Sequence, residues 1–160
     1  MSAAIRPAGI TLLLFLGLAA CATPYEPYSF WNGGGFSETE VQPGLFLVRF
    51  MGNEQTTPDR TADFALLRAA DLCLQRGKDY LLLGDLATQY VQTGYLAGTS
   101  STTENPDPHG NTAITVDTSP PTLLYSPASG ITVTCVAAKG AGTWDAQYLA
   151  RAIRTKYAIS

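Results

Sequence analysis

Three cysteines carry the most distinctive chemistry in this sequence, because a thiol can act as a nucleophile, form a disulfide or bind a metal. Cys21 follows a short uncharged segment, whereas Cys73 and Cys135 lie far apart in the remainder of the chain. The chain has a single histidine, His109. Three cysteines and one histidine argue against most metal sites, so we expect no bound metal.

Cys73 and Cys135 have two possible roles. A secreted domain folds in an oxidising compartment, where two thiols can form a disulfide. Cys135 lies on the inner side of the strand expected over 131–137, but Cys73 lies at the edge of the apolar stripe of its expected helix. The sequence leaves open a disulfide or two buried cysteines that pack as small hydrophobic side chains.

Residues 1–20 have the organisation of a signal peptide. Arg6 precedes eleven uncharged residues, from Ile10 to Ala20. A bilayer-spanning helix needs about 20 apolar residues, so a membrane span is the weaker interpretation.

The residues around Cys21 resemble the lipobox of bacterial lipoproteins. Its motif here is Leu18, Ala19, Ala20 and Cys21. The resemblance implies cleavage before Cys21, a covalent diacylglycerol and an N-acyl chain on that residue, and no other cofactor. Ala22 stands where an Asp would resemble the inner-membrane retention signal, which implies the outer membrane, facing the periplasm. The alternative is a secreted protein that is cleaved nearby and keeps an unmodified Cys21.

The charge balance limits the classes of partner. The chain has 10 Lys+Arg against 13 Asp+Glu, for a net charge of −3, which argues against nucleic acid. Arg151, Arg154 and Lys156 could contact an anionic envelope component. They are also explained as cations that are favoured near the C-terminal end of a helix.

The residues do not form a recognisable catalytic set. Nucleophilic catalysis needs a Ser or Cys beside a His that an acid orients, and the single histidine, His109, lies in a segment that we expect to be mobile and unable to hold such a set in place. Gly33, Gly34 and Gly35 are not followed by the Lys-Ser/Thr of a phosphate-binding loop. We therefore expect no enzyme and identify no small-molecule substrate.

Residues 37–160 are predicted to form the periplasmic domain. A helix is predicted to start at Thr57, Pro58 and Asp59, which are typical of a helix N-terminus, and to end at Gly77. Phe46, Val48 and Phe50 alternate with other residues, as expected for a strand with one apolar face. Strands are predicted at 38–41, 45–51, 80–83 and 131–137, and residues 88–93 either continue the strand 80–83 or form its hairpin partner. Helices are predicted at 57–77 and from Thr143 onward, the second with Leu149, Ala152 and Ile153 on its apolar stripe.

Two segments are expected to lack regular structure. Residues 21–36 contain the lipidated Cys and a Pro/Gly/aromatic tether, whose aromatic rings could lie among lipid headgroups or, as we favour, dock partly on the domain. Residues 98–130 are expected to be a long mobile loop. Residues 98–112 contain no apolar side chain, so burial cannot offset the entropy lost on ordering.

The predicted fold class is α+β. We expect a single small domain, with a mostly antiparallel sheet and two helices packed on one face, after a signal peptide and a flexible tether.

Most of the mature chain resembles a family of small proteobacterial envelope lipoproteins of uncharacterised function. The segments that carry the resemblance are 34–39, 46–53, 63–72, 77–80 and 144–146. The resemblance implies an envelope location and this fold, but no activity. Lys78 and Asp79 depart from the family, in which a shorter polar turn is usual. A more distant likeness, in architecture alone, is to small α+β lipoproteins that sense or relay envelope stress.

The expected function is therefore that of a non-enzymatic lipid-anchored envelope protein with a structural or interaction role at the outer membrane, attached to membrane lipid through Cys21. The alternative is an envelope-stress sensor or assembly accessory that binds a periplasmic protein partner.

Overall fold

The computed structural model describes residues 22–106, 108–109 and 112–160. The predicted signal peptide and the predicted lipid site at Cys21 lie outside the described residues. No helix within the described ranges is both long enough and apolar enough to cross a membrane.

The described residues form two helices and eight strands. In order these are β1 (Gly35–Gln42), β2 (Leu45–Met51), α1 (Pro58–Gln75), β3 (Tyr80–Leu83), β4 (Ala87–Leu96), β5 (Ser100–Pro106), β6 (Thr112–Thr118), β7 (Thr122–Val136), β8 (Trp144–Asp145) and α2 (Ala146–Tyr157).

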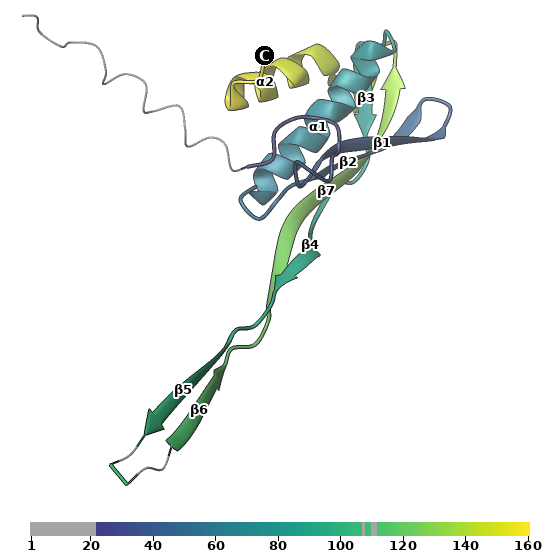
Figure 1. The fold of residues 1–160 in the computed structure, drawn as a ribbon. Helices are drawn as coiled ribbons and strands as arrows, with labels where there is room; N and C mark the ends of the chain where they lie inside the picture. Colours follow the sequence, from purple (N-terminus) through teal and green to yellow (C-terminus); the bar gives the residue numbers. More distant parts are fainter. Residues whose placement is uncertain (1–21, 107, 110–111) are drawn as a thin grey trace, which may run out of the picture.

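The strands form one six-stranded sheet and one two-stranded sheet. The main sheet has the order β1-β2-β7-β3-β8, with β4 also paired to β7, and its strand pairs are antiparallel. Both helices lie on one side of this sheet; α1 packs on β2 and β7, and α2 packs against α1 (Figure 1). The predicted α+β fold class is confirmed.

Local chemistry sets the ends of α1. The Thr57 hydroxyl accepts a hydrogen bond from the backbone N–H of Arg60, and Pro58 occupies the first turn. At the other end, Gly77 has a φ of 67°, a left-handed conformation that favours glycine after a helix. The predicted start and end of this helix are confirmed.

The core lies between α1 and the sheet. Phe46, Val48 and Phe50 of β2 are fully buried, as their alternation predicts, and Phe64 of α1 packs against Phe50. The remaining members of the core are Ala65, Leu67, Ala69, Ala70, Leu72, Cys73, Leu81, Ile131, Val133, Ala146, Ala150 and Ile153.

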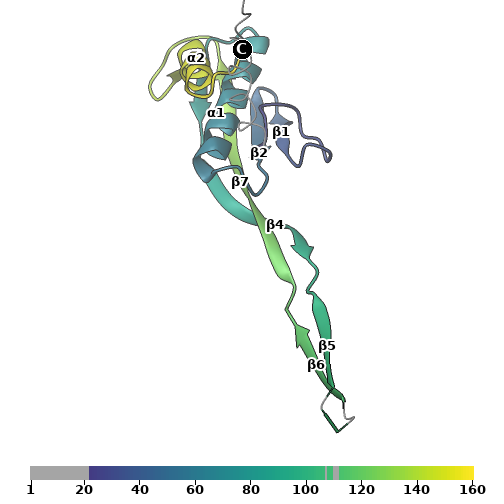
Figure 2. The same cartoon turned by 60° about the vertical axis from the view of Figure 1, so that its left-hand side comes forward.

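The prediction of a long loop over 98–130 is wrong. β7 begins at Thr122 rather than near 131 and pairs with β4 along its first half, while β5 and β6 form a separate two-stranded sheet. Ser, Thr and Val suit strands, and cross-strand backbone hydrogen bonds order this segment without a buried core. Residues 90–126 are here called the arm, and their described part extends away from the helices (Figures 1 and 2).

The second helix starts later than predicted. Asp145, not Thr143, is its N-cap, and the Asp145 carboxylate accepts a hydrogen bond from the N–H of Tyr148 at 2.8 Å. Thr143 instead closes a turn by donating to the carbonyl oxygen of Gly140. Ala152 is exposed and Ala150 is buried in its place.

The predicted tether packs on the domain between residues 22 and 36. The backbone N–H of Thr23 donates to the Thr56 hydroxyl at 3.0 Å, and Thr23 is buried. The Tyr25 ring contacts the rings of Phe36 and Phe64. The favoured prediction of docking is confirmed for this part of the segment.

Candidate functional site

Cys73 and Cys135 form a disulfide that joins α1 to β7. Their Cα atoms are 5.1 Å apart. Cys73 is fully buried, although the apolar stripe read from the sequence placed it at the edge. Of the two roles left open, the disulfide is confirmed and the pair of separate thiols is wrong.

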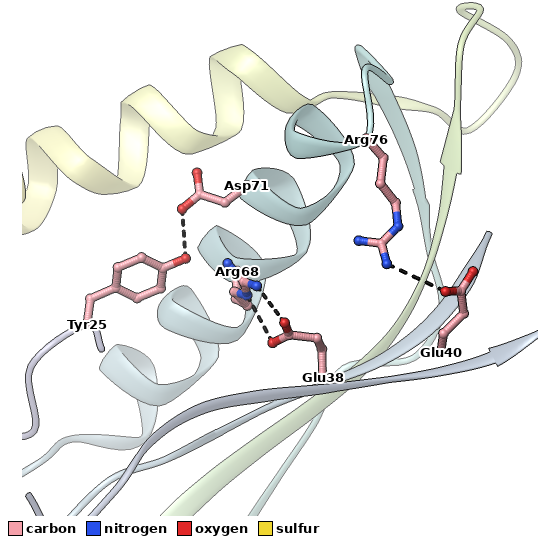
Figure 3. A network of polar contacts seen from close by, with 6 residues as sticks. All are labelled: Tyr25, Glu38, Glu40, Arg68, Asp71 and Arg76. Carbon is pink, nitrogen blue, oxygen red and sulfur yellow. Dashed lines mark hydrogen bonds and ion pairs between the residues drawn. The ribbon is translucent and has the colours of Figure 1, made fainter. Parts of the chain in front are cut away.

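Polar side chains on α1 hold the N-terminal segment and β1 against the helix (Figure 3). The Tyr25 hydroxyl donates to Asp71 at 2.8 Å, and Arg154 of α2 donates to the same carboxylate oxygen at 2.8 Å. Arg68 binds both carboxylate oxygens of Glu38, at 3.0 and 2.5 Å. Such paired contacts satisfy partly buried charges, so this network has a structural role.

The surroundings of Tyr25 raise the pKa of its hydroxyl. Burial, followed by the charge of Asp71 and the hydrogen bond to it, raises the pKa of the Tyr25 hydroxyl above its ordinary value of 10.0. The folded protein therefore holds this proton more tightly than the unfolded chain does. Its contribution to stability is fully present below pH 10 and is lost as the pH rises above that value.

The substitution Tyr25→Phe should cost about 1 kcal/mol of unfolding free energy at pH 8, because it removes the hydrogen bond to Asp71. At pH 11 the difference between the two proteins should shrink to about zero, since ionisation of Tyr25 in the unfolded chain then offsets its stabilising contribution. Urea unfolding at both pH values measures the difference, and the other tyrosines cancel in the comparison. An equal difference at the two pH values would contradict the role of Tyr25.

The three cations of α2 do not form one free cationic patch. Arg154 pairs with Asp71, and Lys156 pairs with Asp63 of α1 at 2.6 Å. Arg151 is exposed and makes no ion pair among the residues that the structure describes. The sequence could not show that two acids of α1 face Arg154 and Lys156. Of the three cations, only Arg151 stays available to contact an anionic envelope component.

The described part of the chain contains no group of three His, Cys, Asp or Glu placed to hold a metal ion. His109 lies in the turn between β5 and β6, distant in the chain from both ends of the disulfide.

A groove of about 590 Å³ lies on the face of the main sheet opposite the helices. Arg49 lies in it, on the face of β2 that does not carry Phe46 and Val48, together with Leu47 and Met51. Asp85 contributes an opposite charge, and Gly130 lies directly opposite Arg49 in the register. The groove therefore combines apolar surface with one charge of each sign.

One face of the arm presents large side chains to solvent. Tyr125 lies opposite Gln92, and Leu123 lies opposite Tyr95, so these side chains share a face with Tyr90. A bulge between Gln92 and Gly94 brings Tyr95 to this face; strict alternation along β4 would place it on the other. We call the set Tyr90, Tyr95, Leu123 and Tyr125 the tyrosine face; its side chains are between 48% and 68% exposed.

The base of the arm is fixed to the domain. The Thr93 hydroxyl, at the bulge, lies 3.0 Å from that of Ser126 and donates to Glu54 at 3.1 Å. Gly52, at the end of β2, donates its backbone N–H to the carbonyl oxygen of Pro127 at 2.9 Å. These contacts hold the base of the tyrosine face beside the domain.

The arm is acidic. Its charged residues are Glu104, Asp107 and Asp117, and no Lys or Arg occurs between residues 79 and 138. The sequence does not reveal the tyrosine face, because the low apolar content of 98–112 predicts a loop over 98–130. The consecutive apolar residues Leu123, Leu124 and Tyr125, which follow Pro120 and Pro121, would have indicated a strand.

Comparison of the chain with protein-family models, with curated proteins and with solved structures finds no match.

Proposed function

We propose that this protein is a lipid-anchored outer-membrane protein without enzymatic activity, which binds a periplasmic protein partner through the tyrosine face of its arm. The lipobox resemblance at Cys21 supports the anchor. The observation that carries the interaction role is the arm itself, a two-stranded ribbon that projects from the domain with four large side chains exposed on one face.

The physical chemistry of this face favours binding. A two-stranded ribbon is marginally stable by itself in water and gains stability when an apolar face is covered. Tyrosine is enriched at protein interfaces, because its ring supplies apolar area and its hydroxyl keeps a hydrogen-bond partner. The tyrosine face combines both features on a segment that neither α1 nor α2 covers (Figures 1 and 2).

Charge selects the kind of partner. Because the arm carries three acids and no Lys or Arg, a partner with cationic residues around an apolar patch is complementary to it. Two arms of the same chain would repel each other when paired side by side. We therefore assign the face to a different, cationic protein rather than to a second copy.

A photo-crosslinking residue at Leu123, on the tyrosine face, should give one recurrent protein adduct in cells. The matched control position is Thr122, which is exposed on the opposite face of the same strand and should give none. The purified partner should bind Tyr95→Ser/Tyr125→Ser about tenfold more weakly than wild type, because two interface tyrosines are lost. Circular dichroism should show an unchanged fold.

Three results would overturn the interaction role: equal adducts from Leu123 and Thr122, adducts only to a second copy of the chain, or no protein adduct. The last result would favour a passive structural component of the envelope. The anchor is tested separately, by the mass of the peptide that contains Cys21 and by release of the Cys21→Ser protein from membranes.

A further inference from the structure

Residues 29–34 form a closed turn with two exposed aromatic rings at its tip. Ser29 and Gly34 exchange backbone hydrogen bonds of 3.0 and 3.3 Å, and Gly33 donates to the carbonyl oxygen of Phe30. Phe30 is 82% exposed and Trp31 is 91% exposed. Their ring centroids are 6.0 Å apart in an edge-to-face arrangement. We call residues 29–34 the aromatic turn.

The aromatic turn lies beside the point at which the described chain begins. A Cβ on Gly34 would lie 3.1 Å from the Cγ2 of Thr23, so the backbone of the turn lies beside Thr23. Thr23 is itself held by Thr56 and accepts a hydrogen bond from the N–H of Asn53 at 2.9 Å. The turn and the start of the domain therefore form one edge of the molecule.

This arrangement limits the distance between a lipid on Cys21 and the domain. Two residues span at most about 7 Å of extended chain. Because Thr23 is buried and hydrogen-bonded, it is already part of the packed domain. A lipid on Cys21 would hold this edge of the domain at the bilayer surface, where Phe30 and Trp31 are exposed.

We propose that the aromatic turn inserts Phe30 and Trp31 into the headgroup region of the membrane as a second contact beside the lipid. This inference rests on the proposed anchor at Cys21. Tryptophan favours the interface between hydrocarbon and water, and a second contact restricts the rotation that a lipid anchor alone would permit. The contact thus sets the orientation of the arm relative to the membrane.

The charges near the turn indicate the lipid chemistry. Glu26 accepts a hydrogen bond from Asn32 of the turn at 3.0 Å, so a carboxylate beside the turn repels anionic headgroups. No Lys or Arg lies between residues 22 and 48. The turn therefore suits zwitterionic headgroups, and the contact depends on ring insertion rather than on ionic attraction.

The two tryptophans of the chain, Trp31 and Trp144, provide a matched pair of reporters. The test uses the full lipidated protein in phosphatidylcholine vesicles at low and high salt, as two variants. Trp144→Phe leaves Trp31 as the reporter, and Trp31→Phe leaves Trp144, which is 55% exposed on β8. Lipids brominated near the headgroup end of their chains should quench Trp31 at least about twofold more than Trp144.

Equal quenching of the two tryptophans, or none, in protein shown by mass to carry lipid on Cys21 would overturn the inference and leave the anchor intact. An unmodified Cys21 would overturn the anchor and the inference together. Quenching of Trp31 that disappears at high salt would also contradict insertion, because it would indicate ionic attraction instead.

Discussion

Loss of the Cys73–Cys135 disulfide is expected to lower the free energy of unfolding by about 2–4 kcal/mol. The bond joins residues 62 positions apart, so it excludes many extended conformations of the unfolded chain. The chain-entropy model gives about 4 kcal/mol for a loop of this length. Urea unfolding of the double variant Cys73→Ala/Cys135→Ala measures this loss. Both cysteines are replaced so that neither thiol is left to pair with Cys21.

Reducing agent supplies the control for this experiment. Reduction should destabilise the wild-type protein by about as much as the double substitution does, and it should not affect the double variant. A wild-type unfolding curve that stays the same under reducing conditions would show that the bond adds no stability.

Phe64→Ala is expected to cost about 3–5 kcal/mol, since it removes a large buried side chain and leaves a cavity. The Phe64 ring is fully buried and contacts the rings of Phe50, Tyr25 and Tyr157, with centroid distances of 5.0, 5.5 and 5.0 Å. These three rings come from the sheet, the N-terminal segment and α2. Phe64 therefore joins all three parts to α1.

Phe30→Ala is the matched control for this substitution. It removes the same side chain from the exposed tip of the aromatic turn and should change the unfolding free energy by less than about 0.5 kcal/mol. Urea unfolding of both variants makes the comparison. Equal losses for Phe30→Ala and Phe64→Ala would show that Phe64 does not hold the core together.

Local patterns were sufficient where neighbouring residues decide the structure. Thr57, Pro58 and Gly77 predicted the ends of α1, because capping and left-handed turn geometry depend on a few adjacent residues. Phe46 and Phe50 predicted the inner face of β2, because side chains alternate strictly in a regular strand.

The arm could not be predicted in the same way. Its order depends on pairing between residues far apart in sequence, such as Tyr95 with Leu123. The bulge next to Gln92 changes which side chains share a face, and neither strand reveals this bulge by itself. The low apolar content of 98–112 predicts a lack of order. In the structure, hydrogen bonds between paired strands order the backbone of this segment without a buried core.

The sequence by itself determined the α+β class, the main helix and the apolar face of β2, because these depend on local chemistry and periodicity. Only the tertiary structure decided that Cys73 meets Cys135 and that acids of α1 neutralise Arg154 and Lys156. It also placed the aromatic turn beside Thr23. Each of these results is a contact between segments remote in the chain, and such contacts follow from how the elements pack rather than from any local pattern.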